Sequence, residues 1–206
     1  MIRFSDEDRA RIKAAINAAE KNTSGEFVAV VARFSDHYVF LPLLWAAVIA
    51  LLVPGIFLML SMPLRFSHIY EVQLSVFVLL AVLLLFIPEL HLALIPKHIK
   101  HARASRLAKA QFYLQGVHLT REHVGVLFFV SLAERYVEIV ADHGIHGKIG
   151  EEHWQAIVRD FVDRVRKGDV VDGFAAAIAA CGDAMSTHYP PEPGSTVELS
   201  DGLIEI

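Results

Sequence analysis

One cysteine, Cys181, is all that this sequence of 206 residues contains. A single thiol excludes a disulfide framework within the chain and a zinc site built from several cysteines. Small residues surround it in sequence, so we predict that Cys181 packs in a core rather than reacting. The sequence also lacks a Walker phosphate loop, a dinucleotide-binding fingerprint and the G-x-S-x-G motif of serine hydrolases. No residue can therefore be assigned a catalytic role from these motifs.

The sequence also lacks a basic surface pattern typical of nucleic-acid binding and a secretory signal peptide. The formal net charge is -4, from 19 basic and 23 acidic residues, and the basic residues do not alternate with aromatic ones. Nucleic acid is therefore not an expected partner. The first 21 residues are charged and amphipathic, without the apolar core of a secretory signal peptide. We expect the first long apolar segment to direct the chain to a membrane.

Charge is absent from residues 38–64 and again from residues 72–88. A bilayer core about 30 Å thick needs roughly 20 apolar residues in a helix. The sequence therefore predicts two membrane spans, at 39–60 and 72–95, joined by a tight turn at 61–71. Glu89 and His91 fall near the end of the second span, where we expect them at the headgroups rather than in a proton relay.

Basic residues are distributed unequally around these spans. Five follow the second span within a short distance: Lys97, Lys100, Arg103, Arg106 and Lys109. The predicted turn contains only Arg65. Because lysine and arginine accumulate in short cytoplasmic flanks, we expect both termini and the soluble part of the chain to be cytoplasmic.

Outside the apolar block, the periodicity alternates between helix and strand. Helices are predicted at 5–21, 97–114, 151–166 and 170–188, and strands at 26–34, 124–132 and 136–141. The first strand is too apolar to stand alone, so we expect it to join the later strands in one sheet. The prediction is an α/β fold: residues 1–38 and 97–189 form one discontinuous domain, 39–96 a transmembrane hairpin, and 190–206 a loosely held tail.

Several short motifs of the soluble part resemble the TPM domain family. In order, they are Ser24-Gly25-Glu26, Gly125-Val126-Leu127, Glu134-Arg135, Val137-Glu138-Ile139, Gly144-Ile145 and Lys167-Gly168-Asp169 with Gly173. The resemblance implies an α/β sandwich of helices around a central sheet, and acid phosphatase activity and calcium binding are attributed to some members. The chain is similar to a bacterial branch with an inserted membrane hairpin, which implies the inner (plasma) membrane.

Two motifs depart from the family pattern. The family's Asp-Asn-Gly before the second strand is replaced by Glu122-His123-Val124-Gly125. Its Thr-Asp at the start of the following helix is replaced by Ile149-Gly150-Glu151-Glu152. Calcium takes six to eight oxygen ligands, usually several carboxylates, and two expected acidic positions have changed. The resemblance therefore implies the fold of the family for this chain, but not its calcium binding or phosphatase activity.

Two groups of polar residues are candidate sites. The candidate ligand-binding residues are Glu134, Arg135 and His123, since a planar guanidinium can hold a phosphate or carboxylate. The candidate metal ligands are Asp142, His143, His146 and Glu152, which offer nitrogen and oxygen donors to a divalent metal such as zinc. The alternatives are a solvated ion pair at a hairpin tip and solvated or capping histidines.

Two functions remain as hypotheses. In the first, the chain is a membrane-anchored binding or accessory module, whose partners are the lipid bilayer and another membrane protein or a small ligand. In the second, it is a metal-dependent acid phosphatase resembling the enzymatic TPM members. A cluster of three or more ligands at a loop edge of the sheet would favour the second.

Overall fold

The computed structural model describes residues 4–36, 38–61, 65–87, 92, 95–120, 123–146, 148–191, 199 and 202–206. Its helices are α1 (Asp6–Glu20), α2 (Phe40–Met59), α3 (Phe66–Phe86), α5 (Lys97–Leu114), α6 (His143–His146), α7 (Glu151–Arg166) and α8 (Val170–Ser186), with the 3-10 turn η1 (Val117–Leu119). Its strands are β1 (Glu26–Ala32), β2 (Gly125–Ser131), β3 (Tyr136–Ala141) and β4 (Leu203–Glu205). The chain forms two compact units, 1–35 with 101–206 and 36–100.

A mixed four-stranded sheet in the order β3-β2-β1-β4 organises the first unit. All seven residues of β1 pair in parallel with β2, from Glu26 opposite Gly125 to Ala32 opposite Ser131. Strand β3 is antiparallel to β2. The segments before and after residues 36–100 therefore share one sheet, and the predicted α/β class is confirmed.

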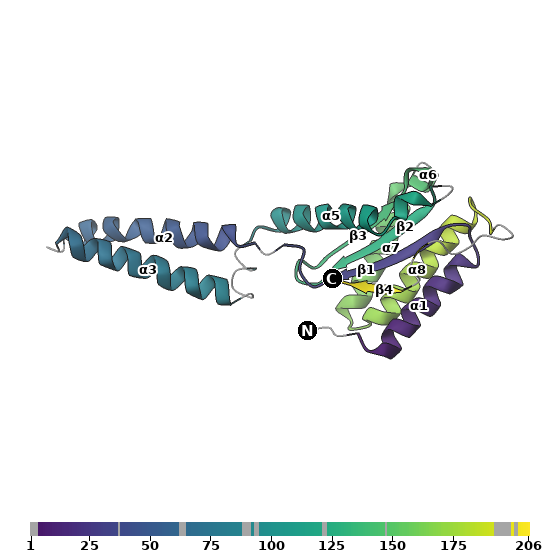
Figure 1. Cartoon of the computed structure of the whole chain (residues 1–206), viewed down its shortest axis with the longest axis horizontal. Helices are drawn as coiled ribbons and strands as arrows, with labels where there is room; N and C mark the ends of the chain where they lie inside the picture. Colours follow the sequence, from purple (N-terminus) through teal and green to yellow (C-terminus); the bar gives the residue numbers. More distant parts are fainter. Residues whose placement is uncertain are drawn as a thin grey trace. The chain divides into compact units, whose positions relative to one another are not determined.

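Both faces of the sheet are covered, because its central strands alternate between two cores. Phe27, Ala29 and Val31 of β1 face the core formed with α1, α7 and α8. Val28 and Val30 face a smaller core formed with α5 and η1. In Figure 1, α5 lies on one side of the sheet, and α1, α7 and α8 lie on the other. A strand that is buried on both faces needs a continuous apolar sequence, which is the pattern of residues 27–32.

The helix bounds follow from local signals. Helix α1 begins after Ser5, whose hydroxyl accepts a hydrogen bond from the backbone N–H of Asp8, while the Asp8 carboxylate accepts one from the backbone N–H of Ser5. The Asp8 carboxylate therefore accepts hydrogen bonds from the backbone N–H and from the hydroxyl of Ser5, and these two bonds lower the pKa of Asp8. Helices α5 and α7 have the predicted bounds, and α7 buries Trp154, Ile157 and Phe161 along one stripe.

The C-terminal segment differs from the prediction of a loosely held tail at residues 190–206. Residues 203–205 form β4, which pairs in parallel with β1 and completes the sheet. The backbone N–H of Arg33 also donates to the carbonyl of Ile206, at 2.9 Å. Three residues are too few to show a strand periodicity in sequence. They form a strand because the open edge of β1 offers backbone groups with which they can form hydrogen bonds. Residues 192–198 and 200–201 lie outside the described residues.

The second unit consists mainly of α2 and α3, which are long and apolar enough to cross a membrane. They pack on each other through a small cluster of Ala46, Ala81 and Leu84. Only 22% of the most apolar window of α2 is buried, and only 6% of that of α3. Large apolar side chains therefore cover most of their surface.

The second apolar helix is displaced from the predicted span at 72–95. It begins at Phe66, so the predicted turn at 61–71 is too long, because residues 66–71 are polar in part but include no helix breaker. It ends at Phe86, and Ile87 is extended, as expected for a residue that precedes a proline. Residues 62–64, Glu89 and His91 lie outside the described residues.

Gly125 lets the start of β2 approach η1 closely. A Cβ atom at this position would lie 2.4 Å from the carbonyl oxygen of Val117, whereas a Cβ at Gly150 would meet nothing within 4 Å. We expect Gly125→Ala to lower the free energy of unfolding by about 1–3 kcal/mol, because the clash is with backbone. Gly150→Ala is the matched control, because its added Cβ meets no neighbouring atom. Thermal unfolding of the two variants checks this prediction, and equal stability of both would contradict it.

Candidate functional site: a histidine-aspartate cluster and an edge groove

The β2–β3 hairpin brings two polar loops to one edge of the sheet. His123 lies just before β2, and Asp142 and His143 lie just after β3. Because Val126 pairs with Ala141, the two loops are neighbours, and the backbone N–H of Asp142 donates to the carbonyl of Gly125 at 3.0 Å. The antiparallel register therefore positions these three side chains together.

His123 is held in an unusual backbone conformation, with φ at 55°. Its backbone N–H donates to the carbonyl of Thr120 at 3.1 Å. The Thr120 hydroxyl is buried and accepts a hydrogen bond from the backbone N–H of Val124, at 3.2 Å. These contacts fix the loop that presents the His123 ring to the sheet edge.

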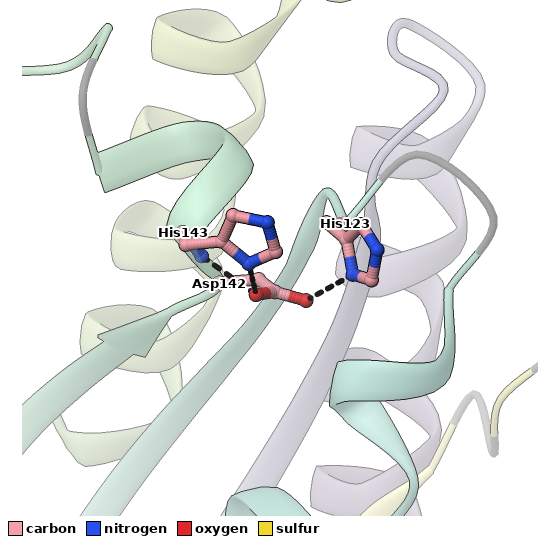
Figure 2. A group of neighbouring side chains, drawn as sticks. All are labelled: His123, Asp142 and His143. Atoms are coloured by element: carbon pink, nitrogen blue, oxygen red, sulfur yellow. Dashed lines mark hydrogen bonds and ion pairs between the residues drawn. The ribbon is translucent and has the colours of Figure 1, made fainter.

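Asp142 lies at the centre of the cluster (Figure 2). Its side chain is only 8% exposed. Its Oδ1 atom accepts a hydrogen bond from the backbone N–H of His143 at 2.6 Å and lies 2.7 Å from Nδ1 of the same residue. Its Oδ2 atom is buried without a hydrogen bond and lies 3.4 Å from Nδ1 of His123.

The two imidazoles flank this carboxylate and are open to solvent. The side chain of His123 is 51% exposed and that of His143 is 76% exposed. Their ring centroids are 4.5 Å apart, and one ligand atom from each of the three residues lies within 4.8 Å of the others. The cluster thus offers two nitrogen donors and one carboxylate oxygen to a single point.

The sequence predicted only part of this group. Asp142 and His143 were expected as metal ligands, but His123 was assigned to a different site with Glu134 and Arg135. Glu152 does not belong to the group of described ligands, and the side chain of His146 lies outside the description. The hairpin register could have identified His123, because residues flanking a two-stranded hairpin at equal offsets meet at one edge.

Glu134 and Arg135 lie at the other end of β2, about 20 Å away along a seven-residue strand. Glu134 is 4% exposed, and its carboxylate accepts hydrogen bonds from the Ser131 hydroxyl and from the backbone N–H of Ser35, the latter at 3.0 Å. Arg135 adopts a left-handed conformation in the turn, with φ at 52°. Glu134 thus ties the β2–β3 turn to the end of β1, and His123 cannot share a ligand with this pair.

We expect Glu134→Ala to lower the free energy of unfolding by about 1–3 kcal/mol, because the buried Ser131 hydroxyl and the Ser35 N–H would lose their acceptor. Arg135→Ala is the matched control and should change it by less than about 0.5 kcal/mol, as for most surface substitutions. Chemical denaturation of the two variants checks this. A larger loss for Arg135→Ala would contradict the structural role of Glu134.

A groove of about 540 Å³ runs along β3. All six residues of β3 line it, together with Lys109 of α5 and with residues of α7, namely Glu151, Trp154, Gln155, Val158 and Arg159. Tyr136 donates from its hydroxyl to Oε2 of Glu138 at 3.1 Å, and Ser105 donates to Oε1 at 3.2 Å. Burial, aided by the Glu138 carboxylate, raises the pKa of Tyr136 to about 12, so this hydroxyl remains a donor at neutral pH.

Calcium does not fit the histidine-aspartate cluster. The three described ligand residues supply one carboxylate and two imidazoles. Calcium takes six to eight oxygen ligands, and imidazole nitrogen suits zinc, copper, iron and nickel instead. The calcium binding that the family resemblance implies is therefore not supported by these residues.

Comparisons with known proteins agree with the fold. The sequence model of the TPM domain family matches residues 89–184. The structure is similar to the NMR structure of the BA42 protein from the psychrophilic bacterium Bizionia argentinensis, with a TM-score of 0.62 and 17% sequence identity. That match covers 98% of this chain and 95% of the other. No curated protein matches the sequence.

Proposed function

We propose that this chain, whose residues 89–184 match the model of the TPM domain family, works as a membrane-anchored binding module for another membrane protein. The anchor is the hairpin of α2 and α3, inserted between β1 and β2 of the domain. The binding site is the groove along β3. The observation that carries this proposal is an open strand edge that a groove follows over its full length.

The exposure of α2 and α3 supports membrane anchoring. Core helices of soluble proteins are mostly buried, whereas the most apolar windows of these helices are 22% and 6% buried. Secretory signals lie near an N-terminus, whereas α2 follows a complete helix and a complete strand. A lipid bilayer is the environment in which such surfaces are stable. The basic residues of α5 favour a cytoplasmic domain at the bacterial inner membrane.

The edge of β3 supports binding of an extended segment. Within the part of the chain that the structure describes, β3 pairs with β2 alone, so its outer edge has backbone N–H and carbonyl groups free to pair. An edge of this kind takes up an added strand through main-chain hydrogen bonds. Six residues of strand extend about 20 Å, enough to hold a short segment of a partner.

Charge on the two walls of the groove favours a segment with acidic side chains. Lys109 lies on the α5 side and Arg159 on the α7 side. Among the described residues, neither makes an ion pair or a side-chain hydrogen bond. Glu138 is already satisfied by Ser105 and Tyr136. We therefore propose that the ligand is an extended, acidic segment of a membrane protein.

Photo-crosslinking in cells tests this proposal. A photoreactive residue at Gln155, in the groove wall, should crosslink to a partner segment, whereas one at Asp163, exposed on the same helix outside the groove, should not. A peptide of the crosslinked segment should then slow hydrogen exchange of β3 amides, and Arg159→Glu should weaken its binding at least tenfold. Equal crosslinking at both positions, or unchanged β3 exchange, would contradict it.

A second candidate function is metal-dependent hydrolysis of phosphomonoesters. The cluster of His123, Asp142 and His143 favours it, because three ligands can leave an open coordination position for a substrate. Arg135, expected from the sequence to hold the phosphate, lies at the opposite end of β2. We therefore expect weak or no hydrolysis of a generic phosphomonoester with zinc, magnesium or calcium. Robust turnover that Asp142→Asn abolishes would favour the enzyme over the binding module.

A further inference from the structure

We propose that His123, Asp142 and His143 form a site for a divalent transition metal, Zn²⁺, in place of the calcium that the family resemblance implies. This inference is independent of the binding module, since the site lies in the loops before β2 and after β3 and shares no residue with the lining of the groove. It concerns which metal this chain selects and which residues hold it.

The Asp142 carboxylate has one buried oxygen that accepts no hydrogen bond. A capping role for the short helix α6 accounts for Oδ1, which accepts a hydrogen bond from the backbone N–H of His143 at 2.6 Å. It does not account for Oδ2, which is buried and accepts none. A buried carboxylate oxygen without a hydrogen bond is costly, and its contact with Nδ1 of His123, at 3.4 Å, is longer than a charge-assisted hydrogen bond. A cation bound between the two would remove that cost. The oxygen lies between the two histidines, so the cation would sit among all three side chains (Figure 2).

The donor set selects the class of metal. Two imidazole nitrogens and one carboxylate suit zinc and its neighbours in the first transition series, and they suit calcium poorly. The same set also occurs with ferrous iron, but affinity at a given site with nitrogen and oxygen ligands is higher for zinc than for Fe²⁺. Zinc is therefore the metal that we expect to bind most tightly among zinc, ferrous iron, calcium and magnesium.

The backbone is already placed for such a site. The Asp142 N–H is bonded to the carbonyl of Gly125, and the His123 N–H to that of Thr120. The ligand atoms lie within 4.8 Å of one another. Ligand atoms around tetrahedral zinc are about 3.4 Å apart, given bonds of about 2.0–2.1 Å. The ligand atoms would therefore have to approach by at most about 1.4 Å, and both imidazoles are exposed side chains. Three protein ligands leave a fourth position for water or for a group from a partner.

Metal titration of the full chain tests the site directly. The protein is purified in detergent without a histidine tag, stripped with a chelator, and titrated with Zn²⁺ against a chromophoric competitor. Separate calorimetric titrations use Ca²⁺ and Mg²⁺, and an anaerobic titration uses Fe²⁺. We expect one Zn²⁺ per chain, a raised thermal unfolding midpoint with zinc, and no displacement of zinc by millimolar calcium. Co²⁺ in place of zinc should give the visible absorption of a site with nitrogen and oxygen ligands.

Single substitutions then assign the ligands. His123→Ala, His143→Ala and Asp142→Asn should each weaken zinc binding at least tenfold, while His153→Ala, exposed on α7 and outside the group, should leave it unchanged. The two alanine variants alter exposed side chains, so their metal-free unfolding midpoints should match that of the parent. Absence of zinc binding, tighter binding of calcium or iron than of zinc, or full zinc affinity in His123→Ala and His143→Ala would overturn the proposal.

Discussion

Replacing residues 39–96 with a short Gly/Ser linker is expected to give a soluble domain that unfolds in one cooperative transition. All seven residues of β1 pair with β2, which follows the apolar unit in sequence. Among the residues that the structure describes, the two cores of the sheet consist of residues outside 36–100. The apolar unit therefore contributes nothing to either core, and its removal should leave both intact.

The energetic cost of the linker is small. Loop closure becomes less favourable by only about 0.6 kcal/mol for each doubling of loop length, so several linker lengths should all permit folding. Calorimetry and circular dichroism should report one coincident transition. The control is the same domain with Val30→Asp, which places an unpaired charge at a fully buried position of β1 and should prevent folding. Two separate transitions, or aggregation at every linker length, would contradict a shared sheet.

Sequence periodicity predicted the elements that bury a long and regular stripe. Strand β3 and helix α7 have the predicted bounds. The apolar residues of α7 repeat with a period of about 3.6, and β3 is a short, largely apolar run rich in β-branched residues. Strand β1 was predicted as buried because its residues 27–32 are continuously apolar. The burial of such segments can be predicted from their own residues, without knowledge of the rest of the chain.

Features that depend on distant partners were not predictable in this way. Strand β4 has three residues, and its pairing with Val30 and its neighbours comes from an open sheet edge. In sequence, Glu134 has the pattern of an ordinary turn residue after a strand. Only the fold shows that its carboxylate is buried and accepts hydrogen bonds from Ser35 and Ser131. In each case the determining contact lies in another part of the chain.

The candidate site was predicted in part for the same reason. Asp142 and His143 are adjacent in sequence, so their proximity is local. His123 is 19 positions before Asp142, and its place beside the carboxylate depends on the register of the β2–β3 hairpin. Residue type indicated a candidate metal site, while the register decides which histidine lies beside the Asp142 carboxylate.

Membrane topology gives the second prediction with an all-or-none effect. We predict that the turn between α2 and α3 faces away from the cytoplasm, and that the domain built on the four-stranded sheet lies in the cytoplasm. The reason is the excess of lysine and arginine in α5, compared with the single Arg65 beside the turn, because such residues accumulate on the cytoplasmic side of membrane spans. Accessibility of introduced thiols can report this, because the native Cys181 is fully buried and burial raises its pKa to about 12.

The most direct test of the proposed membrane hairpin is labelling of single cysteines on intact spheroplasts with a membrane-impermeant thiol reagent. Ser67→Cys lies at the start of α3, and Thr187→Cys at the exposed end of α8, each in a Cys181→Ala background. We predict labelling of Ser67→Cys in intact spheroplasts, and of Thr187→Cys only after permeabilisation. Labelling of Thr187→Cys alone would invert the orientation, and labelling of both positions in intact spheroplasts would contradict the hairpin.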